Sequence, residues 1–116
     1  MGQLHALGAS AVLVAVVAVG LATGVFALRG GSPWVDRLRL GLTLIIGAQV
    51  LFGVVVFLTG ARPGELLHVL YGVVALALLP LATTFATEAP ARDRAWVLVA
   101  ACILLLPLLW RLAATG

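Results

Sequence analysis

Charged side chains are scarce in this 116-residue chain, where 9% of residues are charged and 64% are hydrophobic. A soluble domain carries about 25% charged residues. So few charges cannot cover a water-facing surface, which excludes a soluble globular protein. The composition therefore predicts an integral membrane protein whose first partner is the lipid bilayer. Lysine is missing altogether, and the arginines stand in short polar segments, so we expect no nucleic-acid-binding patch.

The chain also has a single cysteine and no carboxylate inside its long apolar stretches. Cys102 is the only cysteine, which excludes an internal disulfide, and its apolar neighbours favour a packing role. No Asp, Glu, Lys or Arg lies inside a long apolar stretch, apart from Arg111 near the end of the last one. Pumps and ion-coupled transporters place ionisable groups there. The absence argues against a transporter and removes the usual general acids and bases of an enzyme.

Four apolar segments are long enough to cross a bilayer, since a spanning helix needs about 20 such residues. They lie at about 5–28, 40–59, 66–87 and 95–114. The connections between them are short and hold proline, glycine and most of the charge. We expect a single all-α domain over residues 1–116, built as an antiparallel up-and-down four-helix transmembrane bundle.

Arginine placement predicts the orientation of this bundle. Five arginines lie in the segments 29–39 and 88–95, whereas the opposite side holds Arg62 and Arg111. Basic loops stay in the cytoplasm. We therefore expect a multi-pass protein of the cell membrane with both termini outside.

Two histidines are the chief polar groups left in the apolar segments. His5 precedes Arg29 by 24 residues and His68 precedes Glu88 by 20 residues, about 36 Å and 30 Å of helix. Both should lie near the outer interface, on parallel helices that face each other diagonally across the bundle. Two imidazoles in that arrangement can ligate one heme iron from both faces. The alternative is that both histidines only sit at the interface with their tips in water.

Further polar or small residues lie along the same helices. Gln49 should lie near mid-membrane, either as hydrogen-bonding glue between helices or facing a cofactor. Tyr71 and Gly72 follow His68, and Gly53 follows Gln49 by one helical turn. Small residues there leave space for a flat ligand or simply for close packing. Copper or zinc is less favoured because a third ligand is missing, and quinone or chlorophyll in place of heme stays open.

The stretch QVLFGVVVFLTGARPGELLHVLYGVVAL (49–76) resembles the repeating half of the heme A synthase family. Gln49 and Gly53 match the family's Q-x-x-x-G element, and His68 matches its heme-ligating histidine. His5 falls where the family's other ligand lies. The resemblance covers roughly residues 4–80 and implies a four-helix bundle that holds heme b near its outer face.

The resemblance does not extend to the family's catalytic residues. The family's catalytic half has a Glu three residues before the first histidine and an Arg just after it, and here these positions are Gly2 and Ala6. Glu65, in the outer turn, is the nearest carboxylate to His68. We therefore expect a b-type heme protein for electron transfer or heme handling rather than an enzyme. The alternatives are a non-catalytic accessory subunit of a larger respiratory or photosynthetic membrane complex, and a homo-oligomeric half-size synthase.

Overall fold

The computed structural model describes residues 2–60, 62, 66–86 and 88–115, and within them every regular element is an α-helix. The helices are α1 (Gly2–Leu28), α2 (Trp34–Leu58), α3 (Leu67–Ala86) and α4 (Ala91–Thr115). All four are long and apolar enough to cross a membrane. The all-α fold and the transmembrane bundle expected from the sequence are thereby confirmed.

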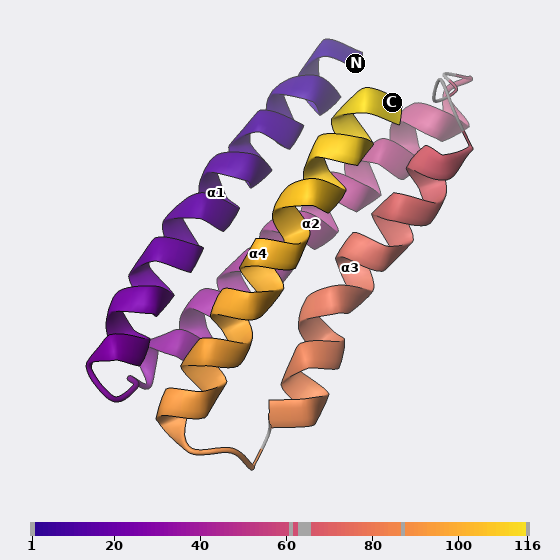
Figure 1. Ribbon diagram of the computed structural model, residues 1–116. Helices are drawn as coiled ribbons and strands as arrows, with labels where there is room; N and C mark the ends of the chain where they lie inside the picture. Colours follow the sequence, from indigo (N-terminus) through magenta and orange to yellow (C-terminus); the bar gives the residue numbers. More distant parts are fainter. Residues whose placement is uncertain (1, 61, 63–65, 87, 116) are drawn as a thin grey trace.

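The four helices run up and down in sequence order, and both termini lie at the same end of the bundle (Figure 1). The molecule measures 47 × 22 × 20 Å. A bilayer with its headgroups is about 40–45 Å thick, so the long axis matches a full crossing. The α2–α3 connection lies at the same end of the bundle as the termini. The α1–α2 and α3–α4 connections lie at the opposite end, which we call the arginine-rich end.

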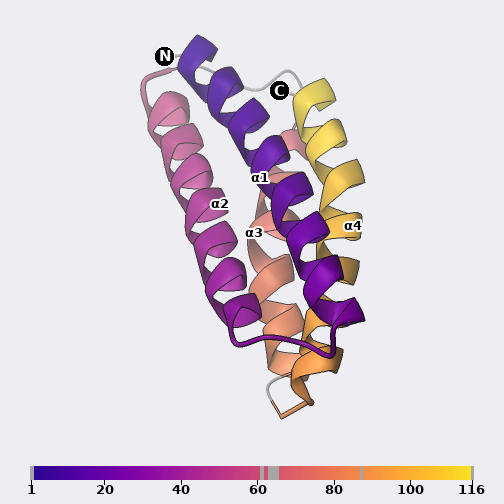
Figure 2. The same ribbon diagram turned by 90° about the vertical axis from the view of Figure 1, so that its left-hand side faces the viewer.

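The neighbours around the bundle are α1–α2, α2–α3, α3–α4 and α4–α1 (Figures 1 and 2). Contact is most extensive between α1 and α4, and least extensive among these pairs between α2 and α3. Helices α1 and α3 are thus diagonal and parallel, as expected. This arrangement allows one residue from each of the two to meet across the bundle axis.

Each helix contributes a fully buried aliphatic side chain to the core, namely Val16, Leu42, Leu79 and Leu105. Most other large apolar side chains stay exposed on the outer faces of the helices. That pattern suits lipid contact, because acyl chains are as apolar as leucine. Cys102 is buried against Gly20, where an added Cβ would lie 3.3 Å from the cysteine Cβ. It is the packing residue that the sequence predicted.

Two helices begin more than a full turn before the apolar pattern indicated. Helix α2 starts at Trp34 rather than near residue 40, and α4 starts at Ala91 rather than near residue 95. Pro33 and Pro90 directly precede these starts, and proline is favoured where a helix begins because its missing N–H needs no partner. The extra turns carry charges, so hydropathy alone missed them.

The α1–α2 connection is set by two glycines. Gly30 and Gly31 have φ values of +94° and +101°, a left-handed conformation that other residues adopt only with strain. A Cβ on Gly31 would also lie 2.5 Å from the backbone carbon of Ala91. This connection therefore packs against the start of α4, next to the charged first turn of that helix.

Candidate functional site

His5 and His68 meet at the end of the bundle that holds both termini. Their ring centroids lie 6.2 Å apart, with an angle of 71° between the ring planes. His5 comes from the second turn of α1 and His68 from the first turn of α3, so the diagonal pair of helices supplies them. Both side chains are half-buried. The two histidines therefore face each other rather than water alone.

Gln49 of α2 holds the His5 ring. Its Nε2 lies 3.1 Å from His5 Nδ1 and 2.7 Å from the His5 backbone oxygen. An amide NH₂ has two protons, and it can donate one to each of these atoms. His5 Nδ1 then accepts, so the proton of the neutral ring sits on Nε2. The opposite amide orientation would put two carbonyl oxygens face to face at 2.7 Å.

The last turn of α4 holds the His68 ring. His68 Nδ1 lies 2.9 Å from the Leu112 carbonyl oxygen, so Nδ1–H donates to it. The last four carbonyls of a helix have no partner within the helix, which leaves this oxygen free to accept. Thr115, which is buried, places its hydroxyl oxygen 3.5 Å from the same nitrogen. In this tautomer the lone pair of the His68 ring is on Nε2.

Two glycines make the His5–Gln49 contact possible. A Cβ on Gly53 would lie 2.9 Å from His5 Cε1, and a Cβ on Gly8 would collide with the side-chain oxygen of Gln49. The imidazole and the amide thus lie directly against helix backbones. Phe52 closes one side of His5, with its ring centroid 6.1 Å away.

Four of the six residues singled out in the sequence come together, namely His5, Gln49, Gly53 and His68. Gln49 reaches the level of His5, although it was expected nearer mid-membrane. The Tyr71 ring instead lies beneath the Arg111 guanidinium, whose central carbon is 5.7 Å from the Tyr71 ring centroid. A Cβ added to Gly72 would lie 4.0 Å from Leu112 Cδ2 of α4. Glu65, the nearest carboxylate in the sequence, lies outside the described residues.

The contribution of α4 to the histidine site was not predicted from the sequence. The Leu112 oxygen is a backbone atom and leaves no mark on the sequence. Thr115 carried a weak signal, as a polar residue at the end of the last apolar segment. Gly8 was visible as a small residue one turn after His5.

Within the described ranges, no group of three or more His, Cys, Asp or Glu side chains could hold a metal ion. A metal at this site would have two histidine ligands and would need its remaining ligands from a cofactor or solvent. Comparison with models of protein families, with curated proteins and with solved structures found no match. The function must therefore be argued from the geometry of the site.

Proposed function

We propose that this protein is a membrane-embedded b-type heme protein, with His68 and His5 as the axial ligands. The observation that carries the proposal is the 6.2 Å between the two ring centroids. A metal–imidazole bond is about 2.0–2.1 Å long, and the ring centroid lies about 1.1 Å beyond the ligating nitrogen. Two rings on opposite sides of one metal ion therefore have centroids about 6.2–6.4 Å apart. Ring planes can take any angle about a shared axis, so 71° is compatible with this arrangement.

The hydrogen bond of His68 also supports ligation through its Nε2 atom. In metal sites the second histidine nitrogen usually donates its proton to a carbonyl or a side chain, and His68 Nδ1 donates in this way to the Leu112 oxygen. His5 Nδ1 instead accepts from the Gln49 amide. The tautomers make the two ligands unequal. His68 would ligate iron in its present tautomer, whereas His5 would first have to move its proton to Nδ1 and give up the hydrogen bond that Nδ1 accepts from Gln49. His68 is therefore the primary ligand.

A bound heme supplies a reversible one-electron couple, and the protein contributes ligation and an apolar surrounding. Because the ligands come from α1 and α3, the side chains of α2 and α4 must make room for the macrocycle. Neither cavity described below is lined by a histidine. The family resemblance favours heme b, and the missing carboxylate favours electron transfer or heme handling over catalysis. The arginine count favours an outer location for the histidine end.

Heme titration of the purified protein tests the proposal. We expect one heme per chain with a low-spin, six-coordinate spectrum. His68→Ala should abolish heme retention, because it removes the primary ligand. His5→Ala should leave a five-coordinate, high-spin species or lose heme as well. Leu67→Ala is the matched control, since Leu67 is an exposed neighbour of His68. Unchanged low-spin spectra in both histidine variants would overturn the assignment.

Gln49 provides a second arm of the same experiment. Gln49→Leu removes the amide that holds the His5 ring in its position. If Gln49 only positions His5, this variant should still bind heme through His68 but with a larger high-spin fraction. A variant with the spectrum of the His68→Ala protein would instead make Gln49 essential for heme binding.

A groove between α3 and α4 favours the accessory-subunit alternative. It has a volume of about 390 Å³ and is lined almost wholly by apolar side chains, among them Val74, Leu78, Leu104 and Pro107. An apolar helix of another subunit, or of a second copy, would fill it. Purified protein without heme that elutes as a stable complex would favour this function.

A further inference from the structure

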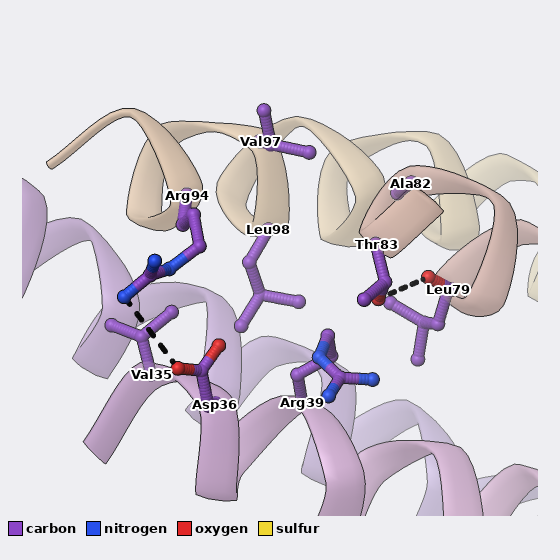
Figure 3. A pocket seen from close by; sticks show the side chains of 9 residues that line it. All are labelled: Val35, Asp36, Arg39, Leu79, Ala82, Thr83, Arg94, Val97 and Leu98. Atoms are coloured by element: carbon purple, nitrogen blue, oxygen red, sulfur yellow. Dashed lines mark hydrogen bonds and ion pairs between the residues drawn. The ribbon is translucent and has the colours of Figure 1, made fainter. Parts of the chain in front are cut away.

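A second site lies at the arginine-rich end of the bundle, far along the helices from the histidines. A cavity of about 240 Å³ opens there between α2, α3 and α4. Figure 3 shows that Asp36 and Arg39 reach it from α2, Arg94 from α4 and Thr83 from α3. The cavity has room for several waters at about 30 Å³ each. A small polar group could therefore enter.

The charge of this cavity is not balanced. Arg94 forms an ion pair with Asp36, with 3.6 Å between Nη2 and the carboxylate oxygen, and donates a hydrogen bond to the Ala89 oxygen at 3.1 Å. Arg39 has no hydrogen bond or ion pair from its guanidinium to any described residue. Two arginines against one carboxylate leave one positive charge unpaired.

Unused donors accompany this charge. The Nε atoms of Arg39 and Arg94 are both buried without a hydrogen-bond partner among the described residues. A buried donor that lacks a partner is destabilising, and donors of this kind are rarely left so in proteins. The Asp36–Arg94 distance is also longer than the 2.7–2.9 Å or so of a strong charge-assisted hydrogen bond. Both arginines line the cavity, so an anion there would balance their unpaired positive charge.

The depth and the walls of the cavity indicate which anion fits. Asp36, Thr83 and Arg94 lie within about one turn of a helix end, at the level where a bilayer has its headgroups. Buried Val35, Leu79 and Leu98 form apolar walls. The planar guanidinium fork matches phosphate oxygens in pairs. A phosphate group with an apolar chain attached would match both parts of the site.

We propose that this cavity binds a phosphate-type anion, from the headgroup of an anionic phospholipid or as free phosphate, through Arg39 and Arg94. The site is independent of the histidine pair. Failure of heme binding would leave it untouched.

Native mass spectrometry and thermal unfolding of the purified full chain test the proposal. The probes are phosphatidylglycerol, phosphatidylcholine with the same acyl chains, and sodium phosphate matched in ionic strength by sodium chloride. We expect phosphatidylglycerol to form a one-lipid adduct and to raise Tm more than phosphatidylcholine does. An equal rise with sodium phosphate alone would identify the free anion as the ligand. No difference among the three probes would overturn the proposal.

Substitutions distinguish a specific anion-binding site from general electrostatic attraction. Arg39→Gln should weaken binding about tenfold, the loss expected for one charge-assisted bond. Arg37→Gln is the control, because Arg37 stacks over the Trp34 ring at 4.6 Å and does not line the cavity. Equal weakening by the two substitutions would overturn the proposal.

A third variant covers the case in which Arg39→Gln fails to fold. Ala82→Leu fills the cavity without changing any charge, since Ala82 lines it. It should remove the lipid adduct and the rise in Tm. Binding at the level of the unsubstituted protein would show that the anion sits elsewhere.

Discussion

Gly53 lies directly against the imidazole of His5, so that a Cβ at this position would be 2.9 Å from His5 Cε1. The contact joins α2 to α1 at the level of the histidine pair. The Gly53 backbone and the His5 ring cannot move independently, because the Gln49 amide, which is also on α2, holds the same ring. The glycine therefore helps to position His5, the second candidate ligand of the proposed heme.

Gly53→Ala should displace His5 and lower both stability and heme affinity. Gly47→Ala is the matched control on the same helix, because no atom lies within 4 Å of its added Cβ. Alanine in a helix is favoured over glycine by about 1 kcal/mol, so the control should be neutral or stabilising. We expect the two variants to differ by about 1–3 kcal/mol in the free energy of unfolding, measured by denaturant titration in detergent micelles. Equal values would mean that His5 is free to shift.

Leu105→Ala should destabilise the bundle far more than Leu104→Ala. Leu105 is fully buried, whereas its neighbour Leu104 is 56% exposed. Removing a buried leucine side chain costs about 2–5 kcal/mol, and removing one that faces lipid or detergent should cost less than about 1 kcal/mol. The same unfolding titration measures both. A larger loss for Leu104→Ala would indicate that the face of α4 assigned to lipid contacts a partner.

Cysteine labelling tests the orientation. Cys102→Ala gives a cysteine-free background at a buried site, into which Ser32→Cys or Thr59→Cys is introduced. Ser32 lies in the α1–α2 connection and Thr59 directly follows α2, so the two report opposite ends. The arginine count predicts that an impermeant maleimide labels Thr59→Cys in intact cells, and Ser32→Cys only after the membrane is opened. The reverse pattern would place the histidine pair on the cytoplasmic face.

The spanning segments could be predicted because apolar length decides them. The helix starts at Trp34 and Ala91 could not be predicted from apolar length. The charged turns that follow Pro33 and Pro90 extend these helices beyond the apolar region. The facing of His5 and His68 followed from equal depth on diagonal helices. The depth of Gln49 did not follow from the sequence, because counting residues along one helix does not show how far neighbouring helices are offset along the bundle axis. Interhelical contacts such as His68 to the Leu112 oxygen depend on that offset and on backbone atoms.

The position of polar groups has a consequence for what the bundle can conduct. No charged residue separates Arg39 from Arg62 in the sequence, and each described helix buries an aliphatic side chain in the core, namely Val16, Leu42, Leu79 and Leu105. Proton pathways need relays of ionisable side chains, and the Thr43 hydroxyl donates to its own helix. The middle of the described helices therefore offers protons no relay of ionisable side chains. The proposed heme site and the proposed anion site would lie on opposite sides of this apolar region.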